Sequence, residues 1–241
     1  MDVSGLILAC VDTDASALES WNRWYDLEHL PPNIALPGVL SGRRYVAPPE
    51  LHEVRLPEKP LAGFEAGRGT NLTLYTLCGD PEEAIAEMTR VREELEAAGR
   101  MVGAGHRVVR AGDALTWNWG VADPALRADS RDIPHIQHTS VRVVLRRGGD
   151  QDVRTEVAPA AVEVAGVHGV LGHRALFQQG TDCDLYLMSG DPASVTREVR
   201  EAARYPDGVE LLLDAPFQLI VPFDYSFVAR IRDSWLPQAI D

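Results

Sequence analysis

An internal repeat is the feature of this sequence that most restricts its fold. The segment TNLTLYTLCGDPEEAIAEM, which starts at Thr70, lies without a gap over TDCDLYLMSGDPASVTREV, which starts at Thr181. Upstream, PGVLSGRRY lies over HGVLGHRAL, so that Arg43 is placed over Arg174. Because a repeat of this size corresponds to one supersecondary unit, the chain is predicted to contain two similar halves.

Each copy is predicted to run strand, helix, strand, strand, helix, strand. SGLILACV and TSVRVVLR open the two copies as strands, and ALTWNWG and APFQLIVPF close them. The best-defined helix follows Asp80, which suits an N-cap, with Pro81 and Glu83 at the favoured next positions. This order is the split β-α-β-β-α-β ferredoxin-like arrangement, whose sheet is covered by helices on one face and open on the other.

We therefore predict an α+β fold in which two ferredoxin-like β-α-β-β-α-β repeats bury their open faces against each other as a single-chain pseudo-dimeric barrel. Repeat 1 spans residues 1–130 and carries a loop insertion near 48–69, which is rich in Pro, Gly and charge. Repeat 2 spans residues 131–241 and ends in a tail. A chain of 241 residues is long enough for two such units.

Composition narrows the range of partners. The formal net charge of -13, from 23 basic and 36 acidic residues, opposes binding to nucleic acid. No apolar run approaches the roughly 20 residues that cross a bilayer, and the N-terminus lacks the basic region of a signal peptide. The 3 cysteines have no C-x-x-C spacing and are predicted to be reduced and buried. We expect a cytoplasmic protein with a small-molecule substrate, no nucleic-acid or membrane partner, and the option of pairing as a homodimer of pseudo-dimers.

A cluster of aromatic and charged residues occurs in only one copy. WNRWYDLEHLPP, which begins at Trp21, ends a predicted helix, whereas the matching region RTEVAPAAVEVAGV of the second copy has no aromatic pair and no Glu-His-Leu-Pro. Features that the fold requires should occur in both copies. The cluster is therefore predicted to form the functional site.

Helical spacing places Tyr25 and Asp26 beside His29. The Asp26 carboxylate and the C-terminal end of the helix dipole should favour the charged imidazole and burial should oppose it, so we expect His29 to titrate near neutrality. Such a histidine can act as a general acid or base, with Tyr25 and Asp26 orienting it. The alternative for His29 is a helix cap that bonds a carbonyl.

The pattern W-x-x-W-Y-D-x-E-H-L-P, followed by P-G-V and R-R-Y, resembles the ferredoxin-like proteins of the dimeric α+β barrel superfamily, most closely the ethyl tert-butyl ether degradation (EthD) type family. The resemblance is strongest over residues 21–45. It implies a fused version of what two subunits usually build, with a histidine facing the cleft between helix and sheet, for which His29 is the matching position. The superfamily includes isomerases, polyketide cyclases, cofactor-free oxygenases and haem-handling proteins, so the resemblance does not fix the reaction.

Aromatic side chains are predicted to wall the pocket. Trp21 and Trp24 lie on the predicted helix, and Trp117 and Trp119 alternate on a strand and so should share a face. For all four, packing in the core is the alternative.

One arginine is predicted to hold an anionic group of the substrate. Arg44 is replaced by Ala175 in the second copy, whereas Arg43 recurs as Arg174 and is expected to be structural. No metal site is predicted, because His135 and His138 lie on a linker that runs into a strand, where the two side chains should point to opposite faces.

These features predict a cofactor-independent enzyme of isomerase, cyclase or lyase type, which uses histidine acid/base chemistry on a small hydrophobic or aromatic metabolite. Two alternatives stay open. The first is a cofactor-free or haem-dependent oxygenase on the same scaffold, with His29 as the haem ligand in the latter case. The second is a non-catalytic accessory protein that binds a hydrophobic small molecule.

Overall fold

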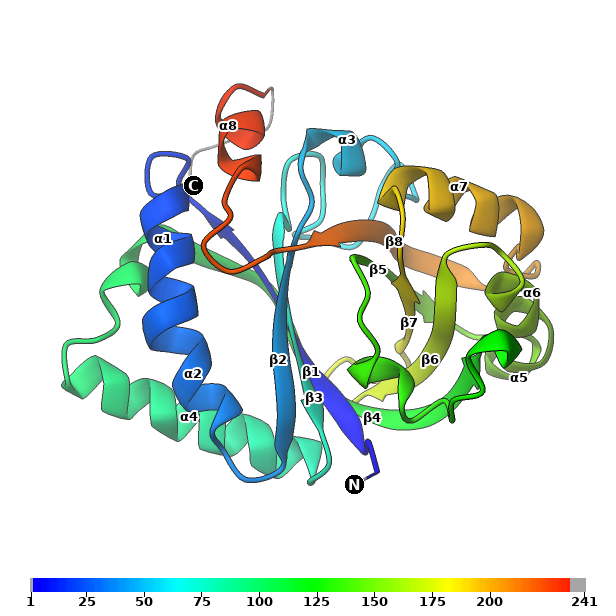
Figure 1. Cartoon of the computed structure of the whole chain (residues 1–241), viewed down its shortest axis with the longest axis horizontal. Helices are drawn as coiled ribbons and strands as arrows, with labels where there is room; N and C mark the ends of the chain where they lie inside the picture. The colour runs from blue at the N-terminus through cyan, green and yellow to red at the C-terminus, as the bar shows by residue number, and fades with distance from the viewer. Residues whose placement is uncertain (1, 235–241) are drawn as a thin grey trace.

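The structure, a computed structural model, describes residues 2–234, and its centre is a closed barrel of antiparallel strands (Figure 1). Neighbouring strands follow the order β1-β3-β2-β8-β5-β7-β6-β4 around the barrel. The strands are β1 (Gly5–Thr13), β2 (Val39–Val46), β3 (Asn71–Leu77), β4 (Arg107–Ala122), β5 (Ser140–Arg147), β6 (Val167–Ala175), β7 (Asp182–Met188) and β8 (Glu210–Leu219). The prediction of an α+β barrel is confirmed.

The two halves of the barrel have the same strand order. The first half, residues 5–122, runs β4-β1-β3-β2, and the second half, residues 140–219, runs β8-β5-β7-β6. Two seams join them. β4 pairs with β6 from Leu115–Ala175 to Ala122–Gly169, whereas β2 pairs with β8 only at Tyr45–Leu219 and Val46–Gln218.

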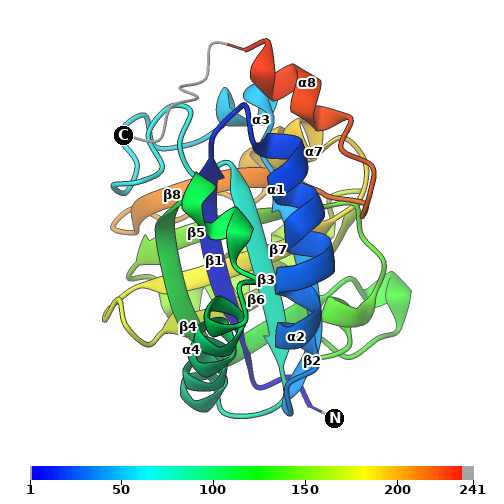
Figure 2. The ribbon, with the colours of Figure 1, turned by 90° about the vertical axis from the view of Figure 1, so that its left-hand side faces the viewer.

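Helices cover the outer face of each half, and α1, α2 and α4 lie side by side over the first half, with β1 and β3 visible between them (Figure 2). The first half carries α1 (Leu18–Trp24), the π-helical turn η1 (Tyr25–His29), α2 (Leu30–Ile34), α3 (Pro49–His52), α4 (Pro81–Ala97) and the 3-10 turn η2 (Val102–His106). The second half carries α5 (Asp150–Asp152), the π-helical turn η5 (Val153–Val157), α6 (Ala158–Val162) and α7 (Pro192–Ala202). The last helix, α8 (Phe227–Arg232), follows β8 but packs beside α1 of the first half. The 3-10 turns η3 (Pro124–Leu126) and η4 (Ile133–His135) connect the halves.

The long helices start where the sequence predicts. The Asp80 carboxylate accepts hydrogen bonds from the backbone N–H groups of Glu82 and Glu83, and Asp191 accepts one from Ser194. Each cap satisfies N–H groups that the first helical turn leaves open. No helix among residues 2–234 has both the length and the apolar character needed to cross a membrane. Cys10 and Cys183 are buried as predicted, whereas Cys78 is half-buried.

The strand pairing corrects how the two copies align. Val39 lies opposite Leu77, and Val167 lies opposite Met188, at the same place before the two Gly-Asp-Pro segments. PGV in the first copy therefore corresponds to AGV in the second, and not to the HGV that follows it. The error arose because Gly-Val occurs twice within AGVHGV, and only the register of the sheet distinguishes the two.

This correction changes the interpretation of the two arginines on β2. In the corrected alignment Arg43 corresponds to Leu171 and Arg44 to Gly172. The premise that Arg43 recurs as Arg174 is therefore wrong. Neither arginine therefore has an arginine counterpart in the second half, and the repeat does not distinguish a structural arginine from a ligand-binding one.

Candidate functional site

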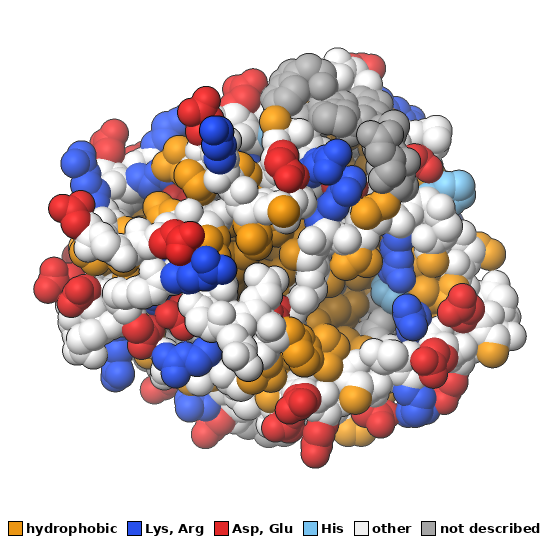
Figure 3. Space-filling view, turned by 180° about the vertical axis from the view of Figure 1, so that it is seen from behind, with side chains coloured by type: hydrophobic (Ala, Val, Ile, Leu, Met, Phe, Trp, Pro, Cys, Tyr) orange, Lys and Arg blue, Asp and Glu red, His pale blue; other side chains and the backbone are white. Residues whose placement is uncertain are grey.

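A cleft of about 330 Å³ opens on the outer face of the first half, between the α1-η1-α2 segment, α4 and the sheet. Its volume lies within the usual range for small-molecule sites, and its walls are mostly apolar. Seen from behind, the molecule shows a hollow with a hydrophobic floor and with a histidine and basic side chains at its edge (Figure 3). The cleft is lined by Ile7, Leu8, Ala9, Val11, Tyr25, His29, Asn33, Tyr75, Ile85, Met88, Thr89, Arg92, Arg107, Val109 and Gly112.

A π-helical turn positions the residues of the cluster. The N–H of Leu30 donates to the carbonyl of Tyr25, because Pro31 and Pro32 follow and lack the N–H groups that a regular α-helix would use. The second half has the same turn at η5, where Val153 and Val157 occupy the positions of Tyr25 and His29. The turn is therefore architectural, and the side chains that it carries distinguish the first half.

His29 lies in the wall of the cleft between two aromatic rings. Its ring stacks on Trp24, with 5.1 Å between ring centroids, and meets Tyr25 edge-on, with 4.7 Å between centroids. Tyr25 and His29 are therefore neighbours, as predicted. Nδ1 is buried and has no hydrogen-bond partner among residues 2–234, so it does not cap a carbonyl. Burial, together with the charges of Arg107 and Arg44, lowers the pKa of His29 to about 3. The prediction that His29 titrates near neutrality is wrong, and its imidazole is neutral at physiological pH.

Asp26 points away from His29. Its carboxylate accepts hydrogen bonds from Nη1 of Arg44 and from the hydroxyl of Tyr225, each at 2.6 Å. The expectation that Asp26 orients His29 came from regular helical spacing. The wider π turn keeps residues i and i+4 together and separates i from i+3, so Tyr25 stays beside His29 and Asp26 does not.

Arg44 fastens the helix to the sheet instead of lining the cleft. Its side chain is 3% exposed and bonds the Asn22 side chain, the Asn22 carbonyl at 3.2 Å and Asp26. Its guanidinium also lies 4.3 Å from the ring centre of Tyr25 and 5.2 Å from that of Trp21. All of these partners belong to the protein, so the arrangement gives Arg44 a positioning role.

Arg44→Met is expected to lower the free energy of unfolding by about 3 kcal/mol, because it leaves the Asp26 carboxylate buried without its cation. Urea denaturation measures this loss. Arg90→Met is the matched control, since Arg90 forms exposed ion pairs and should cost less than about 1 kcal/mol. A stable Arg44→Met protein that has lost only ligand binding would instead restore the predicted role of Arg44 as an anion-binding residue.

Trp21 and Trp24 pack against the residues that line the cleft and do not line it themselves. Trp21 is buried among Val11, Trp24 and Tyr25. The Nε1 of Trp24 donates to the carbonyl of Arg100 at 2.8 Å and so fixes the ring on which His29 stacks. Neither tryptophan belongs to the lining of the cleft, so both contribute through packing.

Trp117 and Trp119 do not share a face. The register between β4 and β6 shifts between these two residues, which is the signature of a β-bulge, and a bulge breaks the alternation of faces. Trp117 packs against the barrel interior and meets His173 edge-on, whereas Trp119 is buried under the helices of the second half and donates to Asp150 at 3.0 Å. The prediction that they share a face and wall the pocket is wrong.

Two arginines that the sequence analysis missed reach the cleft. Arg107 starts β4 and is half-buried, and Arg92 is exposed on α4. They come together because β4 pairs with β1 beneath α4, and no local pattern in the sequence reports this pairing.

Charged side chains fill the corresponding space in the second half. The strand registers place Arg142 where the first half has Ile7, and Asp214 where it has Gly112. Nε and Nη2 of Arg142 donate to the two oxygens of Asp214 at 2.7 and 2.8 Å. In the second half, Arg142 thus replaces the apolar Ile7 of the cleft wall, and Asp214 replaces Gly112.

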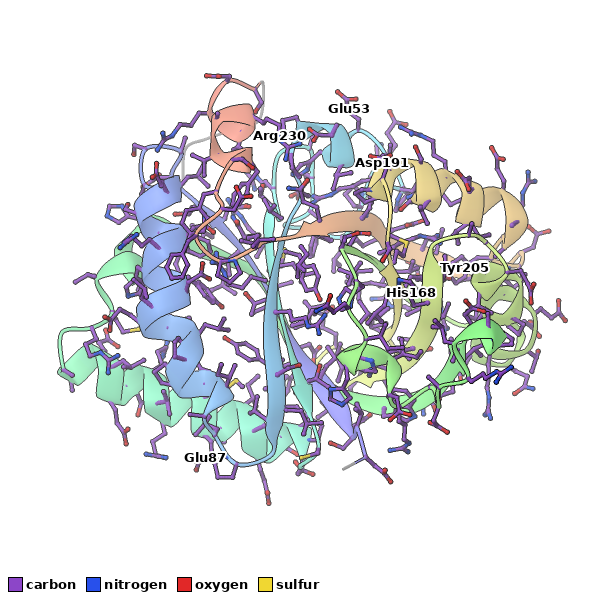
Figure 4. All side chains as sticks on the ribbon, in the orientation of Figure 1. Glu53, Glu87, His168, Asp191, Tyr205 and Arg230 are labelled. Atoms are coloured by element: carbon purple, nitrogen blue, oxygen red, sulfur yellow. The ribbon has the colours of Figure 1, made fainter. Side chains whose placement is uncertain are left out.

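A second buried network lies beside the first. Arg146 takes the place of Val11, and Asp184 takes that of Thr73. Nε of Arg146 donates to Asp184 at 2.6 Å, and the Tyr205 hydroxyl donates to the same carboxylate at 2.8 Å. Tyr205 lies beneath the helices of this half in Figure 4. These networks leave the first half as the side with an open cleft.

The described residues offer no cluster for a metal ion, and His29 does not fit as a haem ligand. No group of three His, Cys, Asp or Glu side chains between residues 2 and 234 could hold a metal, and His135 is exposed while His138 turns to the Tyr45 hydroxyl at 2.7 Å. A haem ligand of the histidine type donates its second ring nitrogen to a carboxylate or carbonyl. Nδ1 of His29 has no such partner, because Asp26 bonds Arg44 and Tyr225.

Known proteins resemble this chain in structure. No family model matches the sequence, and no curated protein sequence matches it significantly. A candidate chlorite dismutase has a TM-score of 0.56 at 14% identity, over 94% of this chain and 98% of that one. A candidate monooxygenase from Fusobacterium nucleatum has a TM-score of 0.50 at 10% identity, over 90% of this chain and 94% of that one. Similarity at this identity shows the fold alone, a closed, eight-stranded α+β barrel.

Proposed function

We propose that this protein is a cofactor-independent enzyme that binds a small hydrophobic or aromatic metabolite in the first-half cleft and transfers protons through His29. One observation carries the proposal: a neutral histidine, held between Trp24 and Tyr25, lines an apolar cleft of about 330 Å³. The reaction would be an isomerisation, cyclisation or elimination, because each of these needs a proton removed from one substrate atom and returned to another.

The neutral imidazole of His29 is the form that accepts a proton. Burial weakens this base in the empty cleft, but a substrate anion formed beside the ring would raise its pKa, because a nearby opposite charge stabilises the imidazolium. Trp24 and Tyr25 fix the ring during the transfer. The hydroxyls of Tyr25 and Tyr75, which lie 3.5 Å apart, are placed to donate to a substrate oxygen.

We also propose that residues 1–130 and 131–241 are two ferredoxin-like repeats of an EthD-like type, fused in one chain. Three observations support this origin: the same strand order in both halves, the π turn at η1 and η5, and the aspartate caps of α4 and α7. The first repeat would have kept a ligand cleft, and the second would have filled its own.

Proton transfer can be tested with 2-tetralone, a ketone with an acidic C–H, in D₂O. The wild-type protein should accelerate exchange of this hydrogen for deuterium, as followed by proton NMR. His29→Ala should reduce the acceleration by about 100-fold or more, the usual contribution of a general acid or base. His106→Ala is the matched control, because His106 is exposed on η2 and should leave the rate unchanged. Equal exchange by the His29→Ala and wild-type proteins would refute the proposal.

A cofactor-free oxygenase is the second candidate, favoured by the shared fold with a candidate monooxygenase. In that reaction His29 would remove a proton from an electron-rich phenol, and the resulting anion would react with dioxygen. An oxygen electrode distinguishes the two: consumption of oxygen that depends on His29 supports the oxygenase, and exchange without consumption supports the isomerase, cyclase or lyase reading.

A further inference from the structure

We infer that the cleft selects ligands that carry an anionic group, a carboxylate or a phosphate, and that Arg107 and Arg92 hold this group. The inference rests on the proposed function, since it assumes that the cleft binds a small hydrophobic molecule. It adds the chemical class of that molecule: an apolar body that ends in an oxyanion.

The first observation concerns Arg107. Its side chain is half-buried in the cleft wall, with its guanidinium 5.9 Å from the ring centre of Trp24. Among residues 2–234 it forms no ion pair with a carboxylate. Burial lowers the pKa of Arg107, and the nearby positive charge of Arg92 lowers it further. A cation that is desolvated, close to a like charge and unpaired is a ready receptor for an anion.

The second observation is that the other arginines around this site are paired. On α4, Arg90 bonds Glu87 and Glu94, and Arg100, which follows this helix, bonds Glu28. The chain carries a net charge of -13, so acidic residues are not scarce. Neither Arg92 nor Arg107 forms an ion pair within residues 2–234, although Glu96 lines the neighbouring groove that both arginines reach, so their positive charge would attract an anionic ligand from solution.

The third observation comes from the second half. There, Asp214 neutralises Arg142 in the layer between helices and sheet. The corresponding position in the first half is Gly112, which lines the cleft and has no side chain. The second half thus contains its own carboxylate, whereas the first half leaves room for a carboxylate from outside.

The two arginines also mark the place where the cleft meets a second hollow. This outer groove has a volume of about 490 Å³ and shares Arg92 and Arg107 with the cleft. An oxyanion at the junction would accept hydrogen bonds from two guanidinium groups while the apolar body lies toward His29. The planar fork of arginine suits a carboxylate or phosphate better than it suits a neutral group.

The test compares 2-naphthoate with 2-naphthamide, which has the same shape and no charge. Dissociation constants are measured by calorimetry, and amide NMR shifts locate the bound probe. The wild-type protein should bind naphthoate about tenfold more tightly than naphthamide, a difference of about 1.4 kcal/mol, and Arg107→Gln should remove this preference because it removes the charged hydrogen-bond donor. Arg92→Gln, on an exposed position that tolerates substitution, should reduce the preference in the same direction, and Arg90→Gln should not.

The outcomes separate the two proposals. If both probes bind in the cleft with equal affinity, or if Arg107→Gln weakens both equally, the anion inference fails and the proposed function stands. If neither probe binds in the cleft of the wild-type protein, the proposed hydrophobic ligand and the inference fail together. Binding of naphthoate that persists unchanged in both Arg107→Gln and Arg92→Gln would also overturn the inference.

Discussion

Asp214→Asn is expected to lower the free energy of unfolding by about 3–5 kcal/mol, the usual cost of removing one partner of a buried ion pair. Asp214 is 1% exposed and neutralises both Arg142 and Arg200. The Nε of Arg200 lies 2.7 Å from Oδ2 of Asp214. Although burial favours the protonated acid, these two cations lower the pKa of Asp214. The asparagine side chain has the same shape and no charge, so it would leave two guanidinium groups without compensation.

Urea denaturation at pH 7 measures this effect. Glu210→Gln is the matched control, because it breaks the exposed pair with Arg147 and should change stability by less than about 1 kcal/mol. Similar losses for both variants would show that the buried network is not an important source of stability.

The free energy of unfolding is expected to fall already in mildly acidic solution, between pH 6.5 and pH 4. Burial lowers the pKa of His52 to about 2, that of His29 to about 3, and those of His138 and His173 to about 4. In the unfolded chain each histidine has a pKa of about 6.5 and therefore binds protons more readily than in the folded state. Stability should be highest above pH 6.5 and should fall as the pH drops from 6.5 to 4.

The expected loss is large. Each of these four histidines contributes about 3 kcal/mol between pH 6.5 and pH 4, at about 1.4 kcal/mol per pKa unit, so that together they are comparable with the whole stability of an average domain. Unfolding by urea at several pH values measures the slope. His173→Gln should be less sensitive to acid by about 3 kcal/mol over this range, because it removes one buried histidine. A flat stability profile between pH 7 and pH 4.5 would contradict this account.

The fold could be predicted because the evidence for it is local and occurs twice. The caps at Asp80 and Asp191 and the apolar strands before them depend on neighbouring residues only, and the structure has them in the expected places. The relation between the copies was harder to predict. Gly-Val occurs twice in AGVHGV, and the pairing of β6 with β7 selects the first occurrence.

The site could be predicted only in part, for a similar reason. Tyr25 and His29 are four residues apart, so a regular helix and a π turn both bring them together. Asp26 is three residues from His29, and there the two geometries differ. The bulge between Trp117 and Trp119 likewise cannot be deduced from the alternation of residues along a strand.

Arg92 and Arg107 lay beyond the reach of sequence patterns altogether. They are brought together by the packing of α4 over β1 and β4, which are distant in the sequence. The sequence contains many arginines, and what distinguishes these two is that both line the cleft while neither forms an ion pair within residues 2–234, an absence of pairing between side chains. Such an absence can be recognised only in the folded molecule.

The two junctions between the halves of the barrel differ in length, and the shorter one lies next to the segment that contacts the helix of the cleft. β2 and β8 meet at only two residue pairs, and the chain that leaves β8 crosses from the second half to pack α8 against α1, where Phe227 and Ile231 contact Leu18. The Tyr225 hydroxyl on this crossing segment donates to Asp26, one turn from His29. This segment therefore connects the second half of the chain to the helix that carries His29. Opening of the barrel at the two-pair seam between β2 and β8 would loosen that helix.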